Sequence, residues 1–216
     1  AQLQVVLFKP EHFGEEIRAI ARSGADAVIV QDLAVAARVR EICPQLQLHA
    51  STQMALHNAQ GVLLAEALGF SRVVLAREAE EGEIAEIRAL GLEVEIFVHG
   101  ALCTGFSGNC YLSSFLSSTS GNRGRCLQPC RLKYRCQERG GERALAEGYL
   151  LSSRDECLLE RVRELAALGA DSLKYLTVEQ LVESCKDAKI GFCLGCFNGE
   201  YPYSLEGYKP SKFKFE

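Results

Sequence analysis

Four cysteines between residues 103 and 130 are the strongest chemical signal in the sequence. Cys103, Cys110, Cys126 and Cys130 follow the pattern C-x6-C-x15-C-x3-C within a loop rich in Gly, Ser and Asn. Structural zinc sites usually pair cysteines with two to four residues between them, and only Cys126 and Cys130 have that spacing. Iron–sulfur clusters accept looser spacing, and residues 96–122 contain no Asp, Glu, Lys or Arg, which suits a desolvated cluster. The pattern therefore favours an iron–sulfur site, with zinc as the alternative.

Cys157 is a fifth candidate ligand. Ser153-Arg-Asp-Glu156 has the form of a capping box, so we expect a helix from Ser153 to Leu168 with Cys157 in its first turn. A helix N-terminus stabilises a thiolate, which favours a metal ligand there. The isolated cysteines are expected to be ordinary buried thiols. These are Cys43, Cys136 and Cys185.

Alternating strands and helices must position these thiols. Short apolar runs alternate with amphipathic stretches from residue 1 to about 99, and the pattern returns at residues 165–173. Such a βαβα pattern produces a parallel sheet. We expect six strands, around Val5–Leu7, Ala27–Val30, Leu46–Leu48, Val73–Leu75, Val94–Val98 and Leu173. The apolar faces expected for the helices are Phe13, Ile17 and Ile20, then Val35, Val39 and Ile42, then Leu56, Leu63 and Leu64, then Ile84, Ile87 and Leu90. Gly24, Gly69 and Gly91 stand where three of these helices would end.

The length of the chain limits the sheet. A complete eight-stranded barrel takes about 250 residues, and residues 100–150 are not of βα type. We therefore expect an α/β fold with an incomplete (β/α) barrel-like parallel sheet, a Cys-rich loop insertion at residues 100–136 and an irregular C-terminal tail.

Polar residues follow the expected strands at the edge where α/β folds bind ligands. His49, Arg77, Glu78 and His99 are the residues predicted to line a catalytic site there. Ser51, Thr52, Gln53, His57 and Asn58 follow the same strand as His49. The alternative is structural: His49 caps a strand, and His57 and Asn58 face solvent on a helix.

Composition narrows the class of protein. The chain has 216 residues and a formal net charge of −4, which argues against a dedicated polyanion binder but allows a local basic patch. It contains no stretch of 18 apolar residues and no signal-peptide pattern. We expect a soluble cytoplasmic protein with no membrane partner, in which disulfides are disfavoured.

Three segments carry a family signature. They read Glu95-Ile-Phe-Val-His-Gly-Ala-Leu-Cys103, Ser107-Gly-Asn-Cys110-Tyr-Leu-Ser-Ser and Gly121-Asn-Arg-Gly-Arg-Cys126-Leu-Gln-Pro-Cys130-Arg131. Together they closely resemble the signature of the collagenase-like peptidase family of unknown catalytic type. Matches such as His49-Ala-Ser-Thr-Gln-Met54 and Leu151-Ser-Ser-Arg-Asp155 extend the resemblance over residues 1 to about 174.

The resemblance implies a barrel-like α/β fold and an iron–sulfur oxidoreductase. Relatives of known function hydroxylate cytidine in ribosomal or transfer RNA, or hydroxylate ubiquinone precursors without oxygen. Those relatives carry a [4Fe–4S] cluster held by four cysteines, and the resemblance implies the same cofactor here. The ligands that resemble theirs are Cys103, Cys110, Cys126 and Cys157, with Cys130 as a near neighbour. The implied partner is therefore an RNA or a small aromatic substrate.

Two other functions stay open. A collagenase-like peptidase needs a nucleophile with a base or an activated water, and the chain has neither His-Glu-x-x-His nor Gly-x-Ser-x-Gly. Cys103 with His99 is the one conceivable thiol–imidazole pair, although Cys103 is better used as a ligand. A non-catalytic metal-binding or assembly protein is the third candidate.

The C-terminal part has a different resemblance. Residues 170–202 look like the C-terminal end of an amidophosphoribosyltransferase, where the matching C-x2-C pair binds a different [4Fe–4S] cluster. Cys193 and Cys196 are therefore further candidate metal ligands. We expect a partial barrel domain at residues 1–174 and a tail of different origin at residues 175–216. Family members normally begin with about two more strand–helix units, so a second copy or another subunit is expected to complete the barrel.

Overall fold

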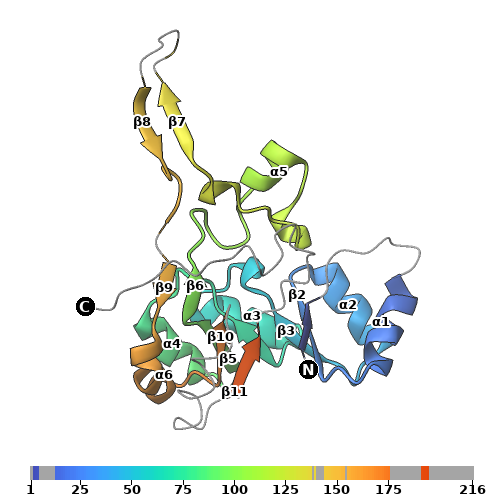
Figure 1. The fold of residues 1–216 in the computed structure, drawn as a ribbon. Coiled ribbons are helices and arrows are strands. Elements are labelled where there is room, and N and C mark those ends of the chain that lie inside the picture. The colour runs from blue at the N-terminus through green and yellow to red at the C-terminus, as the bar shows by residue number, and fades with distance from the viewer. Residues whose placement is uncertain are drawn as a thin grey trace.

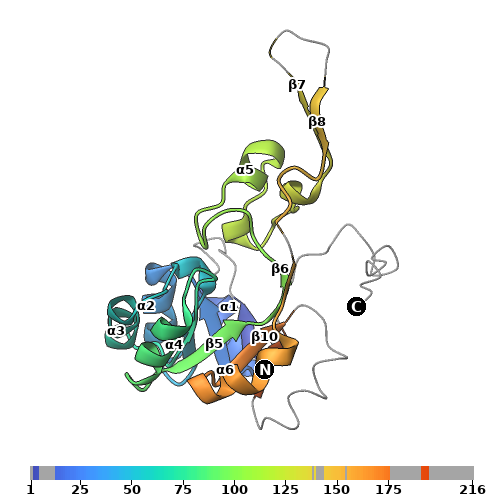
Figure 2. The ribbon, with the colours of Figure 1, turned by 90° about the vertical axis from the view of Figure 1, so that its left-hand side faces the viewer.

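A parallel sheet with helices packed along it forms the body of the protein. The computed structural model describes residues 2–4, 13–137, 139, 144–153, 155–175 and 191–194. An appendage, residues 99–157, projects from one end of the sheet (Figure 1). A view turned by 90° shows the appendage rising away from both the strands and the helices (Figure 2). The α/β class expected from the sequence is confirmed.

Seven parallel strands form the sheet, in the order β1-β2-β3-β4-β5-β10-β11. Their bounds are β1 Gln2–Gln4, β2 Ala27–Val30, β3 Gln47–Ala50, β4 Arg72–Val74, β5 Glu93–Phe97, β10 Ser172–Tyr175 and β11 Gly191–Leu194. The strands expected at β2, β3, β4, β5 and β10 are confirmed, and the one expected at Val5–Leu7 lies outside the described residues. Within the described part of the chain no pairing joins β1 to β11, so the sheet is open.

Helices connect the successive strands. Their bounds are α1 Phe13–Arg22, α2 Leu33–Ile42, α3 Ala59–Ala67, α4 Glu81–Arg88 and α6 Val162–Leu168. Asp32 accepts two backbone hydrogen bonds at the start of α2 and so caps it. Gly24, Gly69 and Gly91 have φ angles of 81°, 86° and 96° just beyond helix ends, as their positions predict. No helix of the described residues is long and apolar enough to cross a membrane.

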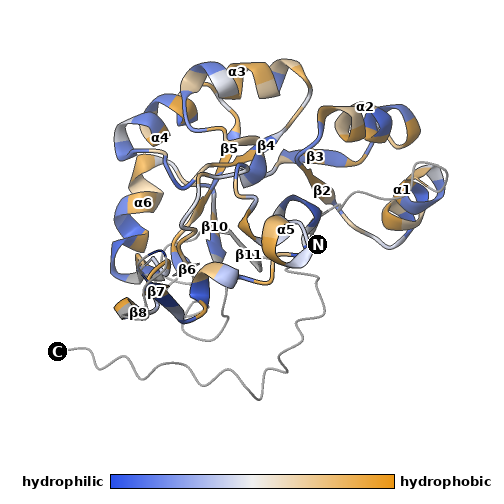
Figure 3. Ribbon diagram, turned by 90° about the horizontal axis from the view of Figure 1, so that it is seen from above, coloured by the Kyte–Doolittle hydropathy of each residue, from blue (hydrophilic) through white to orange (hydrophobic). Residues whose placement is uncertain are grey.

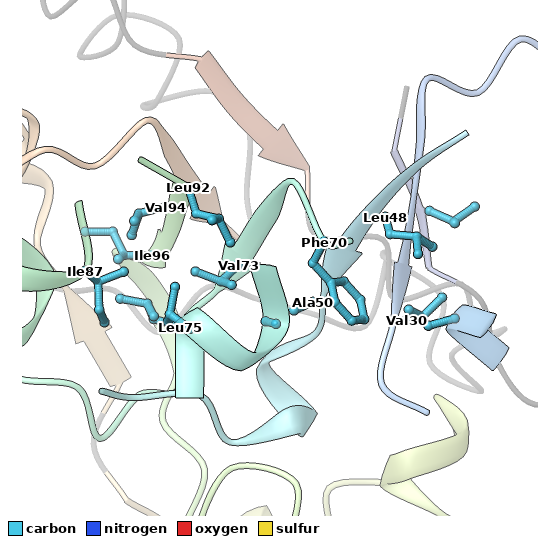
Figure 4. Close-up of a cluster of buried hydrophobic side chains, with 14 of the residues drawn as sticks. Val30, Leu48, Ala50, Phe70, Val73, Leu75, Ile87, Leu92, Val94 and Ile96 are labelled. Carbon is cyan, nitrogen blue, oxygen red and sulfur yellow. The ribbon is translucent and has the colours of Figure 1, made fainter. Parts of the chain in front are cut away.

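The core lies between the sheet and the helices, which form an arc around the strands when viewed from above (Figure 3). Alternate strand residues point into it, together with helix and loop residues that include Phe70, Ile87 and Leu92 (Figure 4). The strand members labelled there are Val30, Leu48, Ala50, Val73, Val94 and Ile96, and Leu75 directly follows β4.

One helix presents a face that the sequence did not predict. In α3, Val62 and Ala65 are buried, whereas Leu63 and Leu64 are 45 % and 60 % exposed. The expectation that the two leucines face the core is therefore wrong. The segment is apolar on every side, so its periodicity does not select one face.

The appendage consists of short elements and two antiparallel pairs. Its strand β6 (His99–Ala101) pairs with β9 (Asp155–Cys157), and β7 (Tyr134–Gln137) pairs with β8 (Ala144–Gly148) in a projecting hairpin. Between them lie α5 Leu112–Ser117, η2 Gly121–Arg123 and η3 Pro129–Arg131. The Cys-rich insertion expected at residues 100–136 therefore forms the larger part of this appendage.

The helix expected to start at Ser153 begins later. Residues 155–157 form β9, a 3-10 turn follows at Leu159–Arg161, and α6 begins only at Val162. The placement of Cys157 in a first helical turn is therefore wrong. Pairing with β6, extended by the Leu158 N–H donating to the Val98 carbonyl at 2.7 Å, uses the backbone groups that a helix would need.

The C-terminal metal pair predicted from the sequence falls at the limit of the described residues. Cys193 lies in β11, where it is paired in register with Lys174 of β10. Cys185 and Cys196 lie outside the described residues, as does the tail from residue 195 onward. The second metal site and the division at residue 174 stay predictions.

Candidate functional site

The Cys-rich loop packs on the carboxyl-terminal edge of the sheet, where ligands of α/β folds bind. Directly beyond β4, the Ser107 N–H donates to the Glu78 carboxylate at 2.9 Å, and the Arg77 N–H donates to the Ser107 hydroxyl at 3.3 Å. Beyond β3, the Gln53 side-chain amide donates to the Gly121 carbonyl at 2.9 Å. These contacts fix the thiol-bearing loop over the ends of β3 and β4.

The loop comes closest to the sheet at Gly108. Its φ is 78°, a left-handed conformation that strains L side chains, and a Cβ atom there would collide with the Gln53 carbonyl oxygen. A glycine at this position therefore allows the loop to dock.

We expect Gly108→Ala to destabilise the protein by at least about 2 kcal/mol, because it adds backbone strain and a clash with a backbone atom. Gly24→Ala is the matched control, since Gly24 has a φ of 81° but nothing within 4 Å of an added Cβ. Gly24→Ala should lower the free energy of unfolding only by the backbone strain, about 1 kcal/mol. Thermal and urea unfolding measure both variants, and equal losses would show that the close approach does not exist.

Four free thiols share one part of the appendage. Burial raises the pKa of the Cys126 thiol, and charge on Cys103 and Cys110 raises it further. Burial likewise raises the pKa of Cys130, the Arg131 guanidinium opposes this, and the other three thiols add to it. Since these groups act on one another electrostatically, they lie close together, and a metal ion that binds there must displace protons.

The chemistry of these thiols fits an iron–sulfur cluster, although their present positions do not enclose one. In the part of the chain that the structure describes, no three Cys, His, Asp or Glu side chains are placed to hold a metal ion as they stand. Thiolates in a setting without carboxylates are nevertheless the donors that a [4Fe–4S] cluster takes. Ligation therefore requires these side chains to turn toward one point.

Cys157 lies apart from the four thiols. It stands opposite His99 in the β6–β9 ribbon, whereas Cys103 lies two residues beyond the last pair, at Ala101. About 3.3 Å per residue puts roughly 13 Å of strand between His99 and Cys103. Continuing the alternation of β6 nevertheless places Cys103 on the same side of the ribbon as His99 and Cys157.

His99 therefore faces a different cysteine from the one paired with it in the sequence analysis. Its imidazole lies across the ribbon from Cys157, not beside Cys103. The Nδ1 atom of His99 is buried and has no hydrogen-bond partner among the described residues.

A cavity of about 530 Å³ opens beside the loop, between the ends of β4 and β5 and helices α4 and α6. The Arg77 guanidinium lies 4.1 Å from the centre of the Phe97 ring at this cavity. Glu156 of β9 also lines it, and burial raises the pKa of this carboxyl group while the charge of Arg77 opposes the rise. A cation and a carboxyl group thus meet at a space of the size that small ligands occupy.

The Glu78 carboxylate anchors the Cys-rich loop and does not line the cavity. Burial tends to raise the pKa of its carboxyl group, but the hydrogen bonds from Ser107 outweigh this and lower the pKa overall. The group is thus a carboxylate near neutral pH and anchors the loop through the Ser107 N–H.

A second group of charged side chains lies on the sheet face that points away from the helices. The Glu95 carboxylate is fully buried and accepts from the Lys174 ammonium at 3.1 Å and the Ser172 hydroxyl at 3.2 Å. Arg72 lies 3.5 Å from Glu95 and also pairs with Glu93 at 2.5 Å. This group was not predicted from the sequence. Its only signal was a carboxylate in the middle of the apolar run 94–98.

His49 borders this charged group. It lies within β3, not beyond it, and is only 2 % exposed, with both ring nitrogens lacking a hydrogen-bond partner among the described residues. Burial lowers the pKa of His49 to about 4, helped by the charge of Arg72 and opposed by Glu95 and Glu93. The side chain is therefore a neutral imidazole in the sheet interior, not a residue at an open mouth.

The low pKa of His49 predicts a loss of stability in acid. The pKa in the folded protein, about 4, lies below the ordinary histidine pKa of 6.5, so the unfolded chain takes up the proton first as the pH falls. Unfolding free energy should be unaffected by this group above pH ~6.5 and fall by up to about 3 kcal/mol between pH ~6.5 and ~4.

Urea unfolding at a series of pH values tests this prediction. His49→Gln should remove most of the acid loss, whereas replacing the exposed His57 with Gln should leave the wild-type profile. An unchanged profile in His49→Gln would contradict it.

The other sequence candidates have structural places. Asn58 caps α3 through a hydrogen bond from the Gly61 N–H at 2.9 Å, and His57 is exposed. Both lie just before the helix, and not on it as the structural alternative expected. Cys43 is buried in the core as expected. Cys136 is exposed on β7, so the expectation that it is buried is wrong, because the hairpin lies outside the core.

The chain is similar in sequence to proteins that carry different functional names. The tRNA hydroxylation protein P1 of Bacillus subtilis is 34 % identical over 165 residues, covering 73 % of this chain and 39 % of the relative. A 23S rRNA 5-hydroxycytidine synthase of Escherichia coli is 36 % identical over 154 residues, covering 71 % of this chain and 23 % of the relative. A collagenase of Porphyromonas gingivalis is 30 % identical over 200 residues, covering 85 % of this chain and 55 % of the relative. The chain thus matches well under half of the two RNA-modifying relatives.

Among solved structures, 3-hexulose-6-phosphate synthase superposes with a TM-score of 0.50 at 13 % identity, covering 88 % of this chain and 76 % of that one. This is a likeness of fold alone. Residues 7–180 match the sequence model of peptidase family U32. The match covers most of the sequence, and the chain belongs to peptidase family U32.

Proposed function

We propose that this chain takes part in the iron–sulfur-dependent hydroxylation of cytidine in RNA, in the cytoplasm. The observation that carries the proposal is the thiol-rich loop fixed over the strand ends beside a cavity that contains Arg77 and Glu156. Relatives named for RNA hydroxylation support the choice of reaction over that on an aromatic quinone precursor.

The proposed ligands are Cys103, Cys110, Cys126 and Cys157. When bound, a [4Fe–4S] cluster supplies a redox centre at the edge of the sheet. The alternation of the β6–β9 ribbon supports Cys157 as the fourth ligand, since it shares a side with Cys103.

The chain's own residues bind and orient the substrate in this proposal. Arg77, held over the Phe97 ring, attracts an anionic group at the cavity. Glu156 lines the same cavity, and its carboxyl group can form a hydrogen bond with the base. Glu78 positions the loop, and His99 is a further candidate for a polar contact because its Nδ1 atom has no hydrogen-bond partner among the described residues.

We also infer that the open sheet is an incomplete (β/α) barrel-like arrangement. Its parallel strand order, the arc of helices around it and the likeness to 3-hexulose-6-phosphate synthase support this reading. Completion by a second copy or another subunit predicts an oligomer, which light scattering of the purified chain tests.

The test of the function is the appearance of hydroxylated cytidine in RNA. The chain is expressed in cells that lack their own RNA cytidine hydroxylation proteins, and their nucleosides are analysed by mass spectrometry. Cytidine that has gained one oxygen atom should appear with the wild type and be absent with Arg77→Ala, whereas Arg18→Ala, on the outer helix α1, should retain it. Its absence with a soluble, iron-loaded wild type would overturn the proposal.

A peptidase is the second candidate, and the facing pair His99 and Cys157 is the observation that favours it. A thiol beside an imidazole is the arrangement of a cysteine nucleophile and its base. Gelatin cleavage that persists without iron and disappears in Cys157→Ser would support this function in place of hydroxylation.

A further inference from the structure

We infer that the appendage binds unpaired RNA, with exposed basic side chains contacting phosphates and exposed aromatic rings stacking on bases. The choice of RNA rests on the proposed function, but the surface is identified from its own residues. The names of the similar proteins assign this surface no role.

Charge is segregated along the chain. Residues 99–137 contain five Lys or Arg and no Asp or Glu, although the whole chain has a net charge of −4. Arg123, Arg125, Lys133 and Arg135 are exposed, and among the described residues none of them forms an ion pair. A cluster of exposed cations on an acidic protein attracts a polyanion, although the exposed Glu147 stands opposite Arg135 in the β7–β8 pair and offsets part of its charge.

The fifth cation, Arg131, has a different role. Its guanidinium donates to the Ser152 hydroxyl at 2.8 Å, the Ser153 carbonyl at 2.6 Å and the Leu102 carbonyl at 2.9 Å. It therefore holds the two chain segments at the base of the appendage together. Among the described residues, Arg123, Arg125, Lys133 and Arg135 form no comparable hydrogen bonds between chain segments.

Exposed aromatic side chains gather in the same part of the chain. Phe115 is 86 % exposed and Phe106 is 75 % exposed, and Tyr111 and Tyr149 are also exposed. Every exposed aromatic side chain of the described residues lies in the appendage. Apolar rings left in water on a projecting element mark a surface that a partner covers.

The mixture of the two kinds of residue favours single strands. Proteins that bind unpaired nucleic acid combine cations along the backbone with rings on which bases stack, whereas an RNA duplex hides its base faces. Lys133 lies 5.5 Å from the centre of the Tyr149 ring, so cation and ring are already side by side. The hairpin and α5 stand clear of the sheet, which leaves room for a polymer (Figure 1).

The exposed aromatic side chains extend to the proposed reaction centre. Phe106 lies between Cys103 and Cys110 in the loop that docks on the strand ends. A base stacked on Phe106 is therefore held next to the thiols.

Fluorescence anisotropy with the iron-loaded 216-residue chain tests the inference. The probes are a labelled single-stranded oligocytidylate and a duplex of the same length, each titrated at several salt concentrations. Wild type should bind the single strand more tightly. Arg123→Ala with Arg125→Ala should weaken binding about tenfold and reduce the salt slope by about 1.4, since each lost phosphate contact removes about 0.7. Phe115→Ala should weaken binding at least fivefold with an unchanged slope.

Matched controls use exposed residues of the sheet domain. Arg18→Ala with Arg22→Ala removes two exposed cations of α1, and Leu64→Ala removes an exposed apolar side chain of α3. These variants should bind as the wild type does, and iron content and melting temperature show that all variants remain folded.

The outcomes separate this inference from the proposed function. Appendage variants that bind RNA like the wild type, or a wild type that binds no RNA, overturn the inference whatever the cells' nucleosides show. Equal binding of duplex and single strand also overturns it. RNA binding that depends on the appendage in a protein that forms no hydroxylated cytidine leaves the surface assigned and refutes only the reaction.

Discussion

Cys126→Ala is expected to reduce the iron of anaerobically purified protein from about four atoms per chain to near zero, with loss of the brown colour. A [4Fe–4S] cluster is held by four thiolates, so losing one in the middle of the loop removes a required ligand. Cys110→Ala should behave in the same way. Iron, acid-labile sulfide and the visible spectrum measure the result.

Cys43→Ala is the control for this experiment. Cys43 is a free thiol buried in the sheet domain, so its replacement should leave the iron content unchanged. Zinc bound in a fixed ratio to the chain, in place of iron, would contradict the prediction and support the alternative of a structural zinc site.

The fourth ligand is tested by a second pair of variants. Cys157→Ala should lose most of the iron and Cys130→Ala should retain it, if Cys157 ligates as the family resemblance implies. Cys130 already lies near the other three thiols, whereas Cys157 must approach along the ribbon. The reverse result would make Cys130 the fourth ligand and leave Cys157 opposite His99.

The sheet was predictable because its signals are local. Apolar runs such as Ala27–Val30 and glycines such as Gly24 specify a strand or a helix end within a few residues, and the structure has both where expected. The face of α3 and the start of α6 were not predictable in this way. Both depend on partners, the sheet for α3 and β6 for residues 155–157, that lie far away in the sequence.

The site was predictable only in part for the same reason. Cysteine spacing pointed to one loop, and that loop does carry Cys103, Cys110 and Cys126 close together. The docking of this loop on Gln53, and the pairing of His99 with Cys157, join segments more than 50 residues apart. The buried charges were missed because their partners, Arg72, Glu95 and Lys174, lie on three strands and become neighbours only in the sheet.

The second large effect is expected from the buried charges of Arg72, Glu95 and Lys174. We expect Glu95→Ala to destabilise the protein by about 3–5 kcal/mol, because it leaves the Lys174 ammonium, 11 % exposed, without its counter-charge. Arg72 keeps its second partner, Glu93, so most of the cost arises at Lys174 and Ser172. Urea unfolding at neutral pH measures the change.

Glu93→Ala is the matched control, since it removes a carboxylate from the same face of the same strand that also pairs with Arg72. Glu93 is 50 % exposed, so solvent screens its pair and the loss should not exceed about 1 kcal/mol. Glu95→Leu combined with Lys174→Met should recover most of the stability, because removing both charges leaves neither one buried alone. If Glu95→Ala costs no more than Glu93→Ala, or if the double variant is no more stable than Glu95→Ala, then Glu95 is not the counter-ion of Lys174 in the folded protein. The charged face of the sheet would then be open to water or to a ligand instead of closed on itself.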